Sequence, residues 1–218
     1  MSTLEGPIVA AASGKATSLV IFLHGYGADG NDLIGLSQPL AGILPDTAFA
    51  SPNAPEPCTA APTGRQWFPI PYLDGSSEIA MMEGLGRAKA ALNAFMDAQM
   101  ADMALAADRV ALVGFSQGTM MSLEVGLRRE AQLAGIVGFS GRLLRAEALD
   151  AEIKSKPPVL LVHGDADQVV PPQSLDDATT ALKAQGIAVD AHSRPGLGHG
   201  IDNEGLSLAA GFLSHVLK

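Results

Sequence analysis

The segment Gly114-Phe115-Ser116-Gln117-Gly118 directly follows an apolar run at residues 110–113, and a segment with helical character follows at 119–129. This G-x-S-x-G pattern predicts a sharp turn from a buried strand into a helix, with the serine in a strained backbone conformation and its hydroxyl pointing away from the sheet. The two glycines are needed because a Cβ at either position would collide with the neighbouring strand or helix. A pattern this short also fits a turn that contains serine by chance, so the rest of the chain must decide whether Ser116 is a nucleophile.

Strand-like and helix-like segments alternate along the chain. The expected strands are 18–23, 47–51, 109–113, 133–139, 158–162 and 188–191, and the expected helices are 31–44, 77–103, 119–129, 172–185 and 204–217. This alternation predicts an α/β fold, with a mostly parallel central sheet and helices on both faces. No repeat or low-complexity linker interrupts the pattern, so residues 1–218 are expected to form a single domain.

Composition narrows the classes of function. Hydrophobic residues make up 47% of the chain and charged residues 17%, which is typical of a compact globular protein. The formal net charge of -9 opposes general electrostatic binding to nucleic acid or to anionic lipid. Cys58 is the only cysteine, which excludes an internal disulfide and a structural zinc–thiolate site.

The location of the protein is predicted from features that the sequence lacks. The N-terminus has no signal-peptide pattern, and no apolar run approaches the roughly 18–20 residues that cross a bilayer. We therefore expect a cytoplasmic protein without membrane insertion. Composition neither requires nor excludes a homodimer.

A nucleophilic Ser116 needs an acid and a histidine later in the chain, in the order Ser, Asp or Glu, His. His199 lies in a glycine-rich loop after the last expected strand, where it can serve as the general base. Asp165 and Asp167 both follow the strand at 158–162. The residues alone leave these two acids nearly equal, since Asp165 could instead hold the amides of its own loop as an Asx-turn. Three loops that leave the carboxyl edge of one sheet in this order favour catalysis.

An oxyanion hole requires two backbone N–H groups. We expect them to be those of Gln117 and of Tyr26, which lies in the loop after the strand at 18–23. The same loop contains a G-x-G-x-x-G pattern at residues 25–30, which is also the dinucleotide-binding fingerprint. However, Asp46 precedes the second strand instead of ending it, and Asp29 would place negative charge beside a pyrophosphate. No cofactor and no metal site are therefore expected.

The sequence resembles the phospholipase/carboxylesterase family of α/β-hydrolases, which includes the acyl-protein thioesterases. The resemblance implies an α/β-hydrolase fold without a large cap domain. It also implies hydrolysis of an ester or thioester through an acyl-enzyme, without a cofactor. Its pattern makes Ser116, Asp167 and His199 the catalytic triad and assigns the oxyanion hole to the amides of Tyr26 and Gln117. The residues that carry the resemblance are 22–30, 51–55, Trp67-Phe68, 114–118, 163–171 and 198–200.

Residues 52–74 contain six of the 14 prolines, together with Trp67, Phe68 and Tyr72, and show no clear periodicity. Such a long loop within a compact domain is usually functional or poorly ordered, and its aromatic residues favour order. We expect these three aromatic residues to line or cover the acyl pocket, because apolar pockets favour aromatic walls. The alternative is that Trp67 only packs the loop onto the body of the protein. The sequence does not say whether this segment moves as a lid.

The chain departs from the family pattern at two places near the expected pocket. The family often has Leu where Tyr26 stands, and an Asp soon after its Trp-Phe pair, whereas this chain continues Pro69-Ile70-Pro71. Three functions are therefore considered for a small-molecule ester or thioester substrate, without nucleic acid. The first is a serine carboxylesterase for small to medium acyl esters. The second is an acyl-protein thioesterase or lysophospholipase, and the third is a catalytically silent binding module, against which the complete triad argues.

Overall fold

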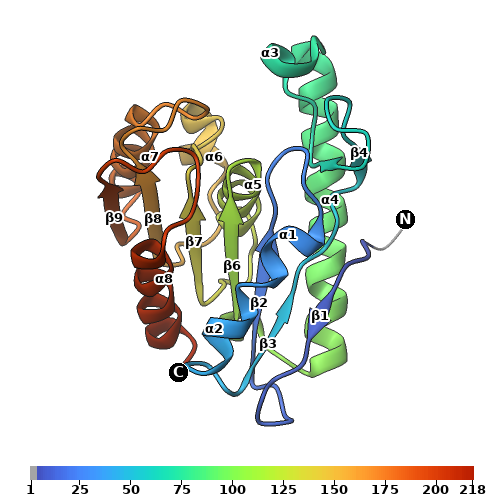
Figure 1. The fold of residues 1–218 in the computed structure, drawn as a ribbon, viewed down its shortest axis with the longest axis vertical. Coiled ribbons are helices and arrows are strands. Elements are labelled where there is room, and N and C mark those ends of the chain that lie inside the picture. The colour runs from blue at the N-terminus through green and yellow to red at the C-terminus, as the bar shows by residue number, and fades with distance from the viewer. Residues whose placement is uncertain (1–3) are drawn as a thin grey trace.

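The computed structural model describes residues 4–218, and its centre is a seven-stranded sheet in the order β1-β3-β2-β6-β7-β8-β9 (Figure 1). Neighbouring strands are parallel except at one edge, where β1 pairs antiparallel with β3. The strands are β1 (Ile8–Val9), β2 (Ser18–Leu23), β3 (Thr47–Ala50), β6 (Val110–Phe115), β7 (Gly135–Phe139), β8 (Val159–Gly164) and β9 (Val189–Arg194). The predicted mostly parallel sheet is confirmed.

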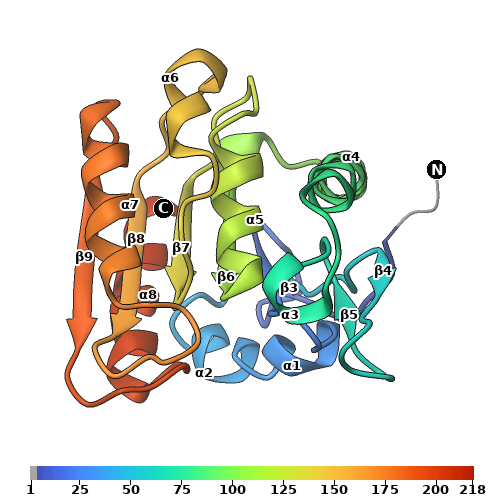
Figure 2. The same cartoon turned by 90° about the horizontal axis from the view of Figure 1, so that it is seen from above.

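Helices cover both faces of the sheet, as predicted (Figure 2). One face carries α4 (Glu78–Met103), α5 (Gln117–Gly126), α6 (Leu149–Glu152) and α7 (Gln173–Ala184), and the other carries α1 (Gly30–Ile34), α2 (Ser37–Ala41) and α8 (Asn203–Val216). This arrangement explains why β2 contains a continuous apolar run, because both of its faces are covered by helices. Leu19 and Ile21 pack with the α4 side, whereas Val20 and Phe22 pack with the α1 and α8 side. A strand buried on both faces has no polar side to expose.

Two parts of the chain differ from the expectation. The expected single helix at 31–44 is broken into α1 and α2, with Gly35 at the C-cap of α1, because glycine is a poor helix former. The proline-rich segment is ordered, as expected, but it contains elements that were not predicted: a short antiparallel pair, β4 (Glu56–Pro57) with β5 (Arg65–Gln66), followed by α3 (Pro71–Asp74). Two 3-10 turns, η1 (Ala107–Arg109) and η2 (Ala146–Ala148), complete the elements. No cap domain covers the sheet edge in residues 4–218.

None of the helices in residues 4–218 has the length and apolar character that crossing a bilayer requires.

Candidate active site

Ser116 lies at the junction of β6 and α5, with φ 54° and ψ -115°. This backbone conformation is strained for a residue with a side chain. A Cβ on Gly114 would lie 2.4 Å from the carbonyl of Gly118, and a Cβ on Gly118 would lie 1.7 Å from the carbonyl oxygen of Leu23. The helix can therefore approach the sheet this closely only where both flanking residues are glycine. This is the strand-to-helix turn that the sequence predicts.

The structure gives the two competing acids different partners. Asp167 Oδ2 lies 2.7 Å from His199 Nδ1, and its Oδ1 accepts from the amides of Val169 and Val170 at 2.8 and 2.9 Å. Asp165 Oδ1 instead accepts from the amide of Gly196 at 2.6 Å, so it fastens the glycine-rich loop that carries the histidine. The geometry thus brings Asp167, not Asp165, to the imidazole.

The environment of Asp167 keeps its carboxylate ionised. Burial acts to raise its pKa, but the hydrogen bonds from His199 and from the amides of Val170 and Val169 outweigh burial, and the pKa is lowered. His163 also reaches this carboxylate, with its Nε2 3.3 Å from Asp167 Oδ2 and 3.0 Å from the carbonyl oxygen of Val170. His163 lies near the end of the buried strand β8, and its side chain supports the Asp167 loop. Nothing in the sequence pattern indicated this contact.

The His199 ring is fixed by its neighbours. It packs on Phe115, with ring centroids 4.8 Å apart, and the adjacent Gly200 carbonyl accepts from Ser140 Oγ at 3.3 Å. Because the Asp167 carboxylate can only accept, Nδ1 carries the proton and Nε2 presents a lone pair. No hydrogen bond joins Ser116 Oγ to this ring within residues 4–218, and catalytic hydrogen bonds of this kind often tighten only when substrate binds.

Two backbone N–H groups lie near the serine without a protein acceptor in the described part of the chain. One belongs to Gln117, the first residue of α5, and the other to Tyr26 in the loop after β2. This loop runs beside the nucleophile, because a Cβ on Gly25 would lie 3.5 Å from the Cβ of Ser116. The hydrogen bond from the Gly27 amide to the carbonyl of Arg65, at 2.9 Å, fixes the loop. Two amides placed in this way can donate to an oxyanion that forms beside the serine.

The dinucleotide interpretation of the same loop fails on its contacts. Asp29 accepts from the amide of Asn31 at 2.8 Å, and Asn53 Oδ1 accepts from the amide of Gly30 at 2.8 Å. A Cβ on Gly30 would lie 2.1 Å from the carbonyl oxygen of Ser51. The protein itself therefore occupies the amides and the space that a pyrophosphate would need.

His24 anchors the Tyr26 loop through hydrogen bonds of its side chain, a role that the sequence did not indicate. Its side chain is fully buried, with Nδ1 2.8 Å from the carbonyl oxygen of Gly25, while Nε2 accepts from the amide of Ala54 at 3.0 Å. Burial lowers the pKa of His24, which keeps the imidazole neutral and able to accept this hydrogen bond. The only signal for this role was the position of His24 directly after a buried strand.

Trp67 is fully buried and is not among the lining residues of the two cavities described below. Its indole Nε1 donates to the carbonyl of His24 at 3.0 Å, and its amide donates to Gln117 Oε1 at 2.9 Å. The Gln117 side chain also donates to the carbonyl of Phe68 at 2.7 Å. These contacts pack the loop onto the body of the protein, and a role of Trp67 in the acyl pocket stays a prediction.

Phe68 and Tyr72 do line a cavity, which has a volume of about 160 Å³. Phe68 is 2% exposed and Tyr72 is 62% exposed, so they form an inner wall and an outer rim. The cavity lies beside the nucleophile turn, because Met120, another lining residue, donates its amide to the carbonyl of Ser116 at 3.2 Å. The remaining lining residues are Ile70, Pro71, Glu78, Met81 and Arg142.

The two departures from the family pattern, Tyr26 and residues 69–71, both form hydrogen bonds to Asp74. The Tyr26 hydroxyl donates to Asp74 Oδ2 at 3.2 Å, and the same oxygen accepts from the amide of Ile70 at 2.9 Å. Burial is the main cause that raises the pKa of Tyr26 to about 12, so the phenol stays protonated and can donate. Tyr26 thereby ties the oxyanion loop to the proline-rich segment.

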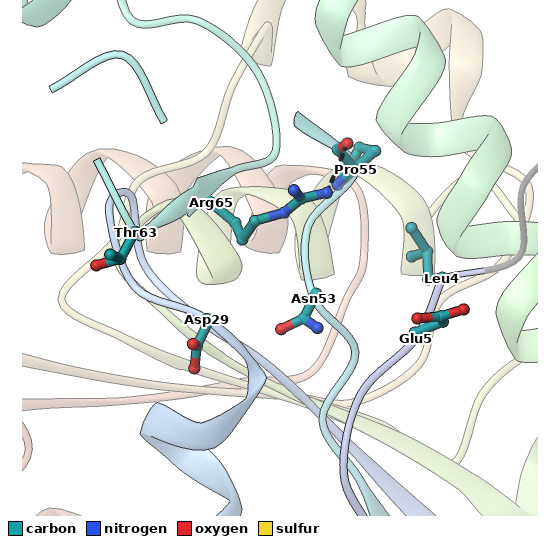
Figure 3. A pocket seen from close by; sticks show the side chains of 7 residues that line it. All are labelled: Leu4, Glu5, Asp29, Asn53, Pro55, Thr63 and Arg65. Atoms are coloured by element: carbon teal, nitrogen blue, oxygen red, sulfur yellow. Dashed lines mark hydrogen bonds between the residues drawn. The ribbon is translucent and has the colours of Figure 1, made fainter. Parts of the chain in front are cut away.

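Figure 3 shows a larger cavity, of about 500 Å³, whose lining residues do not include Ser116, Asp167 or His199. Three of its polar side chains, those of Arg65, Asn53 and Asp29, already have partners within the protein. Arg65 donates to the carbonyls of Ala54 and Pro55 at 2.8 and 2.9 Å, and Asn53 and Asp29 cap α1 as described above. These contacts support the Tyr26 loop. The lining residues are Leu4, Glu5, Asp29, Asn53, Pro55, Thr63 and Arg65.

Comparison with known proteins agrees with this geometry. A family model described as Phospholipase/Carboxylesterase matches residues 4–217. Acyl-protein thioesterase 1 of Neurospora crassa is 31% identical over 97% of this chain and 91% of its own length. A probable carboxylesterase of Oryza sativa is 28% identical over 96% of this chain and 82% of its own length.

Solved structures share the fold over nearly the whole chain. Esterase PE8 superposes with a TM-score of 0.94 at 45% identity, covering 99% of this chain and 100% of that one. Arabidopsis thaliana SOBER1 superposes with a TM-score of 0.80 at 25% identity, covering 93% of this chain and 100% of that one. The α/β-hydrolase fold is therefore confirmed.

Proposed function

This chain belongs to the phospholipase/carboxylesterase family of α/β-hydrolases and is a carboxylic ester hydrolase, and we propose that it cleaves esters of small to medium acyl groups with Ser116, His199 and Asp167. The observation that supports this mechanism best is the hydrogen bond of 2.7 Å between Asp167 and His199, beside a serine at a strained strand-to-helix turn. Few arrangements other than a nucleophile and its base would require this strain.

In the proposed reaction, Ser116 Oγ attacks the ester carbonyl carbon while His199 Nε2 takes its proton. The oxyanion then accepts hydrogen bonds from the amides of Tyr26 and Gln117. Collapse of the tetrahedral intermediate breaks the bond to the leaving oxygen, which receives the proton from His199, and an acyl-serine remains. Water repeats these steps on the acyl-enzyme and releases the carboxylic acid. Throughout, Asp167 stabilises the imidazolium and holds its orientation.

The size of the cavity favours small to medium acyl groups. About 160 Å³ lies beside the nucleophile turn, which is less than the roughly 300–1,000 Å³ of common ligand pockets. The alternative is an acyl-protein thioesterase or lysophospholipase, and the relatives named acyl-protein thioesterase support it. Both candidates use the same machinery and differ in the acyl group and the leaving atom.

The test combines active-site labelling with a substrate panel. A fluorophosphonate probe should label the wild type and the variant Ser122→Ala but not Ser116→Ala. Ser122 is the matched control because it lies on α5 and donates only to the carbonyl of Gly118, at 2.9 Å. Ser116→Ala should lower kcat by about 10³-fold or more with unchanged circular dichroism. Retained turnover or labelling in Ser116→Ala would refute the mechanism, whereas a wild type without turnover and without labelling would favour the binding module.

The panel then separates the two candidates. Initial rates are measured on p-nitrophenyl esters from acetate to laurate, on the matching acyl-CoA thioesters and on a lysophospholipid. A maximum of kcat/KM at short or medium oxygen esters supports the carboxylesterase. A maximum at long thioesters or at the lysophospholipid supports the alternative.

A further inference from the structure

Arg142 differs from the other arginines because its guanidinium has no protein acceptor within residues 4–218, although it carries five N–H donors and a permanent charge. Its side chain is exposed and lies on the loop after β7. The arginines that do donate to a protein acceptor are Arg65, Arg87, Arg109, Arg128, Arg129, Arg145 and Arg194.

The backbone of Arg142 is held close to the nucleophile. A Cβ on the preceding Gly141 would lie 2.9 Å from the carbonyl oxygen of Ser116. On the other side, Arg145 pairs with Glu124, whose side chain is fully buried, at 3.2 Å. The chain is therefore anchored on both sides of Arg142, while the guanidinium itself remains available to a ligand.

Arg142 also lines two neighbouring cavities. It borders the cavity of about 160 Å³ beside Ser116 and a second cavity of about 250 Å³ between α4 and residues 143–145. Met81 lines both cavities as well. A part of the substrate that fills the cavity beside the nucleophile turn would meet the Arg142 side chain, because Arg142 lines this cavity.

The other side chains around the inner cavity are apolar or aromatic, apart from Glu78, which is exposed. A neutral acyl chain would gain nothing from a cation at this position. A carboxylate would gain a charge-assisted hydrogen bond, for which the planar guanidinium is well suited. The chain as a whole carries a formal net charge of -9, so attraction of an anion here would have to be local.

We propose that Arg142 is a specificity-determining residue for esters that carry an anionic group, such as a carboxylate, on the part of the substrate, acyl or alcohol, that enters this cavity. The proposal depends on the ester hydrolysis proposed above. It identifies a class of substrate within that reaction, and it assigns Glu78 the opposite effect, since its carboxylate repels the same anion.

Two matched substrate pairs test the proposal and show whether the anion is recognised on the acyl part or on the alcohol part of the ester. On the acyl side, the p-nitrophenyl monoester of adipic acid is compared with p-nitrophenyl hexanoate. On the alcohol side, para-acetoxybenzoate is compared with para-acetoxybenzamide. In each pair the measured quantity is the ratio of kcat/KM for the anionic ester to that for the neutral ester, after subtraction of uncatalysed hydrolysis.

In one of the two pairs, Arg142→Gln should lower this ratio by about 5- to 10-fold, as expected for an exposed charge pair strengthened by a hydrogen bond. Glu78→Gln should raise the same ratio. Arg87→Gln is the matched control, because Arg87 is an exposed arginine on α4 that pairs with Glu56 and lines neither cavity. It should leave the ratio unchanged.

The proposal is overturned if wild type and Arg142→Gln give the same ratio in both pairs. It is also overturned if Arg87→Gln lowers the ratio equally, because the effect would then be one of net charge. Hydrolysis of neutral p-nitrophenyl hexanoate distinguishes this outcome from failure of the proposed function. If the wild type does not hydrolyse hexanoate, or Ser116→Ala still does, the mechanism itself is wrong.

Discussion

Replacing Asp167 by Asn tests whether this residue sets the tautomer of His199. The two oxygens of Asp167 have separate tasks: Oδ1 accepts from the amides of Val169 and Val170, and Oδ2 faces His199 Nδ1 at 2.7 Å. An asparagine in this site must keep its oxygen toward the two amides, because an NH₂ group there would meet two donors. Its NH₂ group therefore faces the imidazole. Nδ1 must then accept, and the proton moves to Nε2, where the lone pair is needed.

The expected loss is large because the general base is blocked while the oxyanion hole remains. We expect kcat to fall by about 10³- to 10⁴-fold, a change of roughly 4–5.5 kcal/mol in the activation free energy. Asp165→Asn is the matched control on the same loop. Asp165 accepts only from the amide of Gly196, which an asparagine oxygen can still do. This variant should retain activity within about tenfold, since a neutral acceptor only weakens the hydrogen bond.

The assay is kcat and kcat/KM on p-nitrophenyl hexanoate, with circular dichroism to show that both variants are folded. Equal losses in Asp167→Asn and Asp165→Asn would mean that the Asn effect comes from loop disorder. Near-normal kcat in Asp167→Asn would show that the carboxylate does not orient His199, and the tautomer argument would be wrong.

Three further predictions concern the groups around the serine. Gly118→Ala should cost more than about 4 kcal/mol in unfolding free energy, measured by urea denaturation, because the added Cβ would lie 1.7 Å from the carbonyl oxygen of Leu23; near-wild-type stability would contradict the strained turn. Burial lowers the pKa of His24, so the imidazole takes up its proton at a higher pH in the unfolded state than in the native state. The unfolding free energy of the wild type should therefore fall as the pH drops below about 6.5. His24→Gln should show a shallower fall between about pH 7 and pH 5, and an unchanged slope would rule out this titration. Trp67→Phe should lower unfolding free energy by about 1–3 kcal/mol, because it removes the donor to the buried His24 carbonyl. Its profile of kcat/KM against acyl length should stay the same, and a shifted profile would support the hypothesis that Trp67 lines the acyl pocket.

The sequence predicted well those parts of the fold that local chemistry dictates. The strand-to-helix turn at Ser116 needs two glycines that only a close approach explains, and the buried strands β2, β6, β7 and β8 came from apolar runs. Boundaries shifted by a few residues, as at β6, which runs to Phe115. The edge strand β1 was missed because two residues, Ile8 and Val9, carry no periodicity.

The choice between Asp165 and Asp167 shows what the sequence alone leaves open. Both carboxylates follow the same strand, two residues apart, and each accepts a hydrogen bond from a backbone amide. Only the path of the chain after the strand decides which one meets His199. That path depends on contacts between distant segments, such as the one from His163 Nε2 to the carbonyl oxygen of Val170. Residue types and spacing do not contain this information.

Gln117 couples the nucleophile turn to the proline-rich segment. Its amide is one of the two proposed oxyanion donors, while its side chain accepts from the amide of Trp67 and donates to the carbonyl of Phe68. A segment with six prolines lacks six backbone N–H donors and forms only short regular elements, so several of its backbone groups pair with buried side chains elsewhere. His24 and Gln117 provide these partners, and both are held by the rigid sheet edge. The position of Phe68 in the cavity wall is therefore set by the same turn that positions the serine. Because Tyr72 on the rim lies outside this hydrogen-bonded network, substitutions there can reshape the cavity without moving the nucleophile.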